Sequence, residues 1–320
     1  MMNMDIALDM MGGDFAPLQA VKGVGLYLAE RGKDVTLTLI GDEPTVKGLM
    51  ADHAIPLDHV RMVHAAQEIE MDDSPTRALR EKPQSSIAIG FKLLAGNQTG
   101  AFISAGNTGA MMVGSLFSIK AIDGVARPTI GAYIPRESGH LGLMLDAGIN
   151  ADCKPENLSQ FGVLGSLYAE HIMGIPNPRV ALINVGEEEG KGNLLAQAAY
   201  TLLKENPNVH FTGNIEGRDI LLDKADVMVC EGFTGNVILK MAESVYDLVQ
   251  RRGIKDEHFD RFNFEAYGGV PVLGVAKPVI IGHGISHSVA FKNMIRIAEK
   301  MIEKELMQKM VEVFSVRAIH

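Results

Sequence analysis

The chain has 320 residues, of which 47% are hydrophobic and 22% charged, so it can bury a large core and is not expected to be disordered. Its net charge of −9 argues against a general nucleic-acid binder, because such proteins need a basic surface. Its two cysteines form no CxxC pair, which excludes a disulfide framework and a cysteine zinc site and fits a cytoplasmic location. No signal peptide or membrane-spanning run is expected.

Short apolar strands alternate with helices along the chain. Strands are predicted at residues 4–9, 35–40, 101–104, 179–184, 226–230 and 279–282, and the last helix at 286–314. This rhythm predicts an α/β fold with a mostly parallel sheet covered by helices on both faces, a three-layer α/β/α arrangement. The length allows one large domain over residues 1–320 or two lobes, and no linker marks a boundary. Right-handed crossovers place the glycine-rich turns at one sheet edge, so a single cleft is expected.

The sharpest local signal is SAGNTGA at residues 104–110, where a strand ends, two glycines follow and a helix begins. Backbone N–H groups at such a helix start favour a bound anion. Ser104, Asn107 and Thr108 add side-chain donors, and Gly106 allows a ligand to approach closely. The alternative is that these residues only cap a helix, as Ser, Asn and Thr often do.

The segment VGEEEGKGN, residues 185–193, places Lys191 between two glycines at another helix start. Its spacing does not match a phosphate-binding loop of the Walker type. A lysine there can hold phosphate or stabilise an oxyanion. For at least one of the three glutamates, the favoured interpretation is a solvated helix start.

Further polar turns are MGGD (11–14), GNIEGRD (213–219), EGFTGN (231–236) and HGIS (283–286). Together they favour an anion-binding site. His283 is the histidine placed at such a turn, with a structural role as the alternative. Cys230 is interpreted as a buried structural thiol rather than a nucleophile. No serine-hydrolase, zinc-protease or dinucleotide-binding motif is present, and no metal or cofactor is expected.

These motifs, with DIALDMMGGD, LDAGIN and YGGVPVLG in the same order, resemble the bacterial phosphate acyltransferase of phospholipid synthesis over residues 4 to about 300. The resemblance implies a homodimer with an isocitrate/isopropylmalate-dehydrogenase-like fold and no nicotinamide. It also implies formation of fatty acyl phosphate from inorganic phosphate and acyl carrier protein thioester, as the first step toward phosphatidic acid. A downstream membrane glycerol-3-phosphate acyltransferase is the expected recipient, which fits a cytoplasmic protein with peripheral membrane contact.

Lys191, Asn236 and Asn150 are the catalytic candidates. The candidates for binding substrate or phosphate are Asp9, Gly12, Gly13, Ser104, Gly106, Asn107, Thr108, Asn193, Asn214, Glu216, Thr234 and His283. The chain departs from the family pattern at Glu231 and Ile149. It also has a shorter, charged segment after Asn236, which disfavours membrane docking through that segment.

The expected chemistry is direct attack of phosphate on the thioester carbonyl, with an acyl-enzyme on Cys230 as the competing route. Two other functions stay open, a dehydrogenase on the same fold and a non-catalytic sensor of phosphorylated metabolites. An acidic carrier needs a local basic surface on this acidic chain. The candidates are Arg251, Arg252 and Lys255, or Lys292, Arg296 and Lys300, and both sets can equally be ordinary solvated helix faces.

Overall fold

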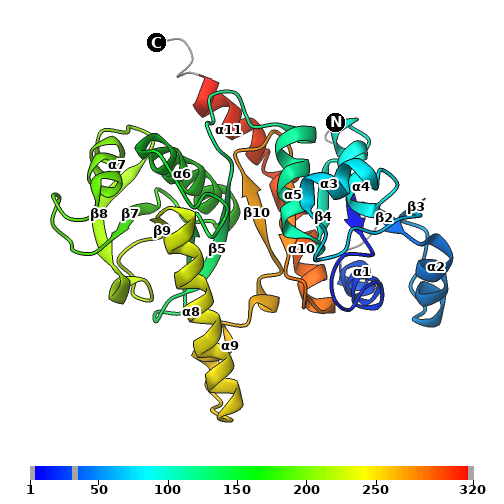
Figure 1. The fold of residues 1–320 in the computed structure, drawn as a ribbon. Coiled ribbons are helices and arrows are strands. Elements are labelled where there is room, and N and C mark those ends of the chain that lie inside the picture. Colours follow the sequence, from blue (N-terminus) through cyan, green and yellow to red (C-terminus); the bar gives the residue numbers. More distant parts are fainter. Residues whose placement is uncertain (1–3, 31–34, 316–320) are drawn as a thin grey trace. The chain divides into compact units, whose positions relative to one another are not determined.

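The computed structural model describes residues 4–30 and 35–315 and divides the chain into two compact units (Figure 1). Unit 1 comprises Met1–Ala121 and Phe264–Met307. Unit 2 comprises Ile122–Asn263 and Gln308–His320. Each unit has its own sheet and its own buried core of aliphatic side chains.

The sheet of unit 1 is parallel except for one strand. Its order is β3-β2-β1-β4-β11-β10, and β10 runs antiparallel to β11. The carboxyl ends of β1, β4 and β11 therefore lie next to each other at one edge of the sheet. The strands are β1 (Asp5–Asp9), β2 (Thr36–Gly41), β3 (Val60–His64), β4 (Ala101–Ser104), β10 (Gly269–Leu273) and β11 (Val279–Gly282).

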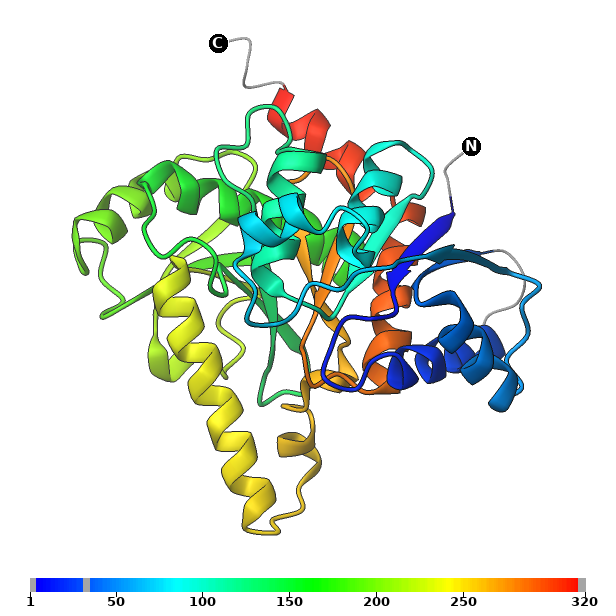
Figure 2. The same cartoon turned by 45° about the vertical axis from the view of Figure 1, so that its right-hand side comes forward.

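Helices pack against this sheet through apolar side chains. α10 (Ser288–Glu303) contacts β4 and β11 and packs along α1 (Leu18–Glu30), as Figure 2 also shows. α4 (Ser86–Ala95) packs on β1 and β4, where Phe91 meets Phe102 edge to face with ring centroids 5.1 Å apart. The other elements are α2 (Glu43–Asp52), α3 (Pro75–Glu81), α5 (Thr108–Gly114), the π-helix η1 (Ser115–Ile119) and the 3₁₀-helix η4 (Phe264–Ala266).

The sheet of unit 2 has the order β5-β6-β9-β7-β8, and only β5 runs antiparallel to its neighbour. The strands are β5 (Thr129–Pro135), β6 (Leu141–Leu145), β7 (Arg179–Asn184), β8 (His210–Glu216) and β9 (Val227–Val229). The helical segments are α6 (Pro155–Tyr168), η2 (Ala169–Met173), α7 (Leu194–Lys204), η3 (Gly217–Asp219), α8 (Gly232–Arg251) and α9 (Glu257–Asp260). α6 packs on β6, β7 and β9 and contacts α7, while α8 extends away from this sheet (Figure 1).

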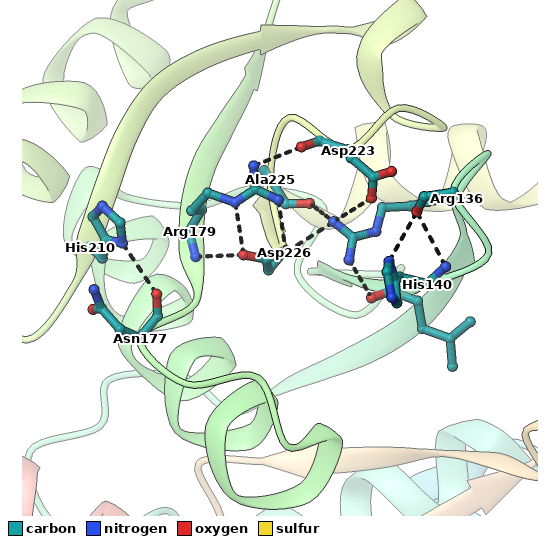
Figure 3. A network of polar contacts seen from close by, with 10 residues as sticks. Arg136, His140, Asn177, Arg179, His210, Asp223, Ala225 and Asp226 are labelled. Carbon is teal, nitrogen blue, oxygen red and sulfur yellow. Dashed lines mark hydrogen bonds and ion pairs between the residues drawn. The ribbon is translucent and has the colours of Figure 1, made fainter.

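The amino ends of the unit 2 strands are tied together by a buried ionic network (Figure 3). Asp226, just before β9, accepts hydrogen bonds from Arg179 Nε at 3.0 Å and from Arg136 Nη1 at 3.0 Å. The Arg136 guanidinium also donates to the carbonyl oxygens of Ala225 and Leu141, at 2.9 and 3.1 Å. This network fixes the amino ends of β6, β7 and β9, which lie opposite the turns at the carboxyl ends of these strands.

The predicted α/β fold with a mostly parallel sheet is confirmed, and the strands at 101–104, 179–184 and 279–282 have the predicted bounds. The single C-terminal helix predicted at 286–314 is wrong. Glu305 adopts a left-handed conformation with φ of 52°, which ends α10 and starts α11 (Leu306–Ser315). The charged segment that follows Asn236 also contains the short helix α9 (Glu257–Asp260).

Among the described residues, no helix is long and apolar enough to cross a membrane.

Candidate active site

Two turns of unit 1 meet around the fully buried carboxylate of Asp9, at the end of β1, and a third turn is joined to them. Asp9 accepts the backbone N–H groups of Met11 at 2.9 Å and Gly12 at 3.1 Å. The Ser104 hydroxyl, at the end of β4, donates to Asp9 Oδ2 at 2.7 Å and accepts the Gly106 N–H at 3.0 Å. The β1 turn is also joined to the β11 turn, because the Asp14 N–H donates to the Gly284 carbonyl at 2.7 Å. The predicted convergence of these turns is therefore present within unit 1.

Gly12 is required by this close packing. A Cβ atom there would lie 2.6 Å from Asp9 Oδ2 and 2.6 Å from the Gly106 nitrogen, closer than real Cβ contacts occur. Gly13 has φ of 106°, a region that favours glycine. Both glycines thus serve the turn itself.

Asn107 holds a neighbouring loop in place. Its carbonyl oxygen caps α5 by accepting the Ala110 N–H at 2.9 Å. Its amide nitrogen donates to the backbone carbonyls of Glu70, Met71 and Asp73, at 3.0, 3.2 and 3.1 Å. Both amide hydrogens are engaged by the protein, so Asn107 does not offer the ligand donor that the sequence suggested. Thr108 remains exposed at the helix start.

A pocket of about 300 Å³ lies beside these turns, and its walls are acidic. Met11, Gly12, Gly13 and Gly106 line it together with Asp14, Glu68 and Glu70. Burial raises the pKa of Glu68, and the charges of Glu70 and Asp9 raise it further. Burial also raises the pKa of Asp9, against the hydrogen bonds that favour its ionised form. Such a pocket suits a group that donates hydrogen bonds better than it suits a dianion. His283 lies on the exposed side of the β11 turn, and its Nδ1 accepts the Ile285 N–H at 3.4 Å.

In unit 2, a second buried carboxylate plays the part that Asp9 plays in unit 1. Asp146 follows β6 and accepts the N–H groups of Gly148 at 3.1 Å, Ile149 at 3.2 Å and Asn150 at 2.7 Å. The Asn150 amide donates to Asp146 Oδ2 at 2.6 Å and to the Pro128 carbonyl at 2.9 Å. Asn150 is therefore buried within the turn. Asp146 was not predicted from the sequence, although Leu-Asp with a glycine two or three residues later occurs at the ends of both β1 and β6.

The β9–α8 turn packs directly on the Asp146 turn. A Cβ at Gly235 would lie 1.8 Å from the Asp146 carbonyl oxygen, so this approach needs glycine. Glu231 caps α8, because its carboxylate accepts the Thr234 N–H at 2.9 Å and also contacts the Thr234 hydroxyl. The longer Glu side chain at this position thus makes a full cap. Asn236 is exposed, and its amide lies against Gly148.

The loop between β7 and α7 carries Lys191 at the surface. Its ammonium lies 3.8 Å from Glu188, and both side chains are more than half exposed, at 52% and 71%. Asn193 caps α7 by accepting the Ala196 N–H at 2.8 Å. The Asn214 amide donates to the Glu188 carbonyl at 2.9 Å and so fixes the same loop.

Two sequence interpretations of this region are wrong. The three glutamates are solvated, as expected, but they precede the Asn193 cap by four to six residues and each pairs with a lysine, so they do not lie at the helix start. The pairs are Glu187 with Lys224 at 2.6 Å, Glu188 with Lys191 at 3.8 Å, and Glu189 with Lys204 at 2.9 Å. Asn214 and Glu216 lie on β8 rather than in a tight turn, which begins only at Gly217.

The candidate residues form two clusters. Unit 1 gathers Asp9, Gly12, Gly13, Ser104, Gly106, Asn107, Thr108 and His283, and unit 2 gathers Asn150, Lys191, Asn193, Asn214, Glu216, Thr234 and Asn236. Cys230 is buried in unit 2, and burial raises the pKa of its thiol well above the usual value. Burial likewise raises the pKa of Cys153 to about 11. Among the described residues, no group of His, Cys, Asp and Glu side chains could hold a metal ion.

Each unit is thus a mostly parallel α/β layer whose polar turns sit at the carboxyl ends of its strands, the position where enzymes of this class bind ligands. The chain belongs to the family described as "Fatty acid synthesis protein", which it matches over residues 4–309. It is 41% identical to the phosphate acyltransferase of Dictyoglomus turgidum, with 97% of each chain covered. It is 40% identical to that of Halothermothrix orenii, covering 95% of this chain and 96% of the relative. The predicted family and enzyme type are confirmed.

Solved structures with the same fold have much lower identity. A phosphotransacetylase from Streptococcus pyogenes is 16% identical, with a TM-score of 0.68 and 94% of each chain covered. A putative 4-hydroxythreonine-4-phosphate dehydrogenase from Salmonella typhimurium is 13% identical, with a TM-score of 0.58, covering 93% of this chain and 99% of that one. These likenesses show the fold alone.

Proposed function

We propose that the protein transfers a fatty acyl group from acyl carrier protein to inorganic phosphate, the first step toward phosphatidic acid. The observation that carries this proposal is the end-to-end similarity to phosphate acyltransferases within a fatty acid synthesis family. The dehydrogenase alternative is not favoured, because the named relatives are acyltransferases and no dinucleotide-binding motif follows the first strand.

The chemistry needs no covalent enzyme intermediate. An oxygen of hydrogen phosphate attacks the thioester carbonyl carbon, and the tetrahedral intermediate expels the carrier thiolate. That thiolate takes the phosphate proton, which leaves acyl phosphate and the free carrier thiol. Burial raises the pKa of both Cys230 and Cys153, which disfavours the thiolate that an acyl-enzyme would need and so supports this direct route.

We assign to Lys191 the positive charge that stabilises the incoming phosphate or the developing oxyanion. Its pairing with Glu188 is loose and exposed, and pairs of that kind contribute little stability. An incoming phosphate or a developing oxyanion can therefore replace Glu188 as its partner at low cost. The acidic pocket of unit 1 disfavours a phosphate dianion, so the proposal places phosphate at the unit 2 turns. The unit 1 carboxylates would instead accept amide N–H groups of the carrier's prosthetic arm.

The proposal includes a homodimer. α8 exposes an apolar stripe at Phe233, Val237, Met241, Val245 and Leu248, whose exposed fractions range from 43% to 67%. These positions recur every three or four residues and share one helix face, which a second copy of the chain would cover. Sedimentation of Met241→Glu beside the wild type tests this, and an unchanged oligomeric state would contradict it.

Acyl phosphate would pass to a membrane glycerol-3-phosphate acyltransferase, which fits a cytoplasmic, peripheral protein.

The decisive experiment is a product assay. The purified protein is mixed with palmitoyl-carrier protein and phosphate, and hydroxylamine traps any acyl phosphate as the hydroxamate. Hydroxamate formation that depends on both phosphate and enzyme is expected. A nicotinamide absorbance assay on the same preparation serves as the control for dehydrogenase activity. Absence of hydroxamate with a folded protein would defeat the proposal.

A further inference from the structure

Unit 2 contains a pocket of about 340 Å³ between the β7–α7 loop and the β9–α8 turn. Its most buried apolar lining residues are Leu158, Leu182 and Cys230, which are at most 3% exposed. Leu195 and Ala196, in the first turn of α7, complete the apolar wall. The polar lining residues are Asn184, at the end of β7, and Asn193, Glu231 and Thr234, from the two turns described above. The pocket is therefore apolar inside and polar where it meets the candidate site.

Apolar side chains continue outward from this pocket onto the surface. Val185, which lines it, is 79% exposed, and Leu194, which lies between two lining residues, is 86% exposed. Single exposed apolar side chains are common on proteins. Val185 differs because it belongs to the lining, so an apolar ligand entering the pocket would cover it as well.

We propose that this pocket binds the first part of the fatty acyl chain of the thioester substrate. This inference rests on the proposed function and names the place of the chain within it. A methylene group needs roughly the share of space of a water molecule, about 30 Å³, so the pocket takes on the order of ten methylenes. The prosthetic arm of a carrier is a poorer occupant, because its amides would lose their hydrogen bonds against the leucines.

The position of the pocket fits the chemistry. Asn193 lines the pocket and lies two residues after Lys191, and Thr234 lines it from the neighbouring turn. A chain seated among Leu158, Leu182 and Leu195 therefore leaves its carbonyl end at the turns that carry these polar groups. Each buried methylene strengthens binding about fourfold. The wild-type kcat/KM should then rise with chain length until about ten methylenes are buried and should level off beyond that.

Ala196→Phe tests the pocket by filling it. Ala198→Phe is the matched control, since Ala198 lies on the same helix two residues on and is exposed. With dodecanoyl-carrier protein, Ala196→Phe should lose at least tenfold in kcat/KM. With butyryl-carrier protein, it should lose less than threefold, and the control should match the wild type with both. A wild-type chain-length profile in Ala196→Phe would overturn the proposal.

A binding measurement decides the question independently of turnover. The chain contains no tryptophan, so Leu195→Trp introduces a single reporter into the pocket wall. Saturable quenching by 12-bromododecanoate is expected in Leu195→Trp and not in the exposed control Ala198→Trp. Equal quenching in both, or none in Leu195→Trp, would overturn the pocket assignment. Failure of the proposed function is a different result, because the wild type would then form no acyl phosphate from any chain length.

Discussion

Asp9 and Asp146 occupy equivalent places in the two sheets. Each follows a leucine at the end of a buried strand, is at most 1% exposed, and accepts backbone N–H groups from the turn after it. A buried carboxylate is costly unless such donors surround it. Each turn is thus held by hydrogen bonds from its backbone to a buried carboxylate, which fixes the backbone where a ligand would bind.

At Lys191 the charge, rather than the length of the side chain, is expected to matter. Lys191→Ala and Lys191→Met should both lower kcat by about 10² to 10³, as loss of one oxyanion donor does in other enzymes. The fold should be unaffected, because the side chain is exposed and only loosely paired with Glu188. Steady-state kinetics at saturating phosphate, with melting temperatures alongside, measure this. Near-normal turnover in either variant would remove Lys191 from the mechanism.

Gly12→Ala should disturb the turn that Asp9 organises, because the added carbon meets Asp9 Oδ2 and the Gly106 nitrogen at 2.6 Å. We expect a loss of about 1 to 3 kcal/mol in the free energy of unfolding, together with reduced activity. Gly48→Ala is the control, since Gly48 lies in α2 and a Cβ added there would meet no atom within 4 Å. That substitution should stabilise by about 0.5 to 1 kcal/mol. Chemical denaturation of both variants gives the comparison, and equal stabilities would contradict it.

At the scale of elements, the sequence predicts those strands whose short apolar runs end in or lead into a glycine-containing turn, and it misses β3, β5, β6, β8 and β10. The strands at 101–104, 179–184 and 279–282 have this form. The break at Glu305 was not predictable, because no proline or glycine marks it and the amphipathic pattern continues. Two of the lysine partners of the three glutamates, Lys204 and Lys224, come from distant positions, so spacing alone could not reveal them.

The sequence could predict candidate residues whose role depends on a single turn. It could not predict the role of residues whose hydrogen-bond partners lie in another turn or loop. Asn107 looked like a ligand donor, yet its amide serves the loop at Glu70 to Asp73, which the sequence places about 35 residues away. Asp146 was missed because its role appears only when Asn150 and the Gly232–Asn236 turn fold onto it. The grouping of turns into two units depends on tertiary packing, which periodicity does not encode.

The network that joins β6, β7 and β9 makes unit 2 sensitive to acid. Burial opposes the charge of Asp226, but hydrogen bonds from Arg179 and Arg136 prevail and lower its pKa to about 2. The unfolded value is about 3.9, so this group contributes about 2 kcal/mol above pH 4, which is lost as the pH falls toward 2. Asp226→Asn should remove that pH dependence. It should also lower the free energy of unfolding by about 3 kcal/mol at pH 7, because the buried Arg136 charge loses the Asp226 carboxylate.

Urea unfolding between pH 7 and pH 2 measures both effects. Asp223→Asn is the matched control, because Asp223 also lies 3.2 Å from Arg136 Nη1 but its side chain is 40% exposed. Its loss should stay below about 1 kcal/mol. If Asp226→Asn keeps the wild-type slope of stability against pH, the network does not set the acid response.

At the scale of the whole molecule, a net charge of −9 opposes the approach of an acidic carrier protein, so docking depends on where the basic side chains are unpaired. The two candidate surfaces differ in how their basic side chains are paired. On α10, Lys292 and Arg296 both pair with Glu30 of α1, the lysine at 3.0 Å. Among the described residues, no carboxylate lies within ion-pair distance of Arg251, Arg252 or Lys255, which are exposed at the end of α8. We therefore propose the end of α8 as the docking surface.

Reversal of Arg251 and Arg252 to Glu should therefore raise KM for the carrier substrate at least fivefold and leave kcat within twofold, because the surface lies roughly 25 Å along α8 from Thr234. Added salt should weaken carrier binding more in the wild type than in this variant, since screening acts on the charges that were removed. The matched control is Lys292→Glu with Arg296→Glu, which should lower the melting temperature by breaking the contact with Glu30 and leave KM unchanged. A raised KM in the control together with an unchanged KM in the α8 variant would move the docking surface to α10.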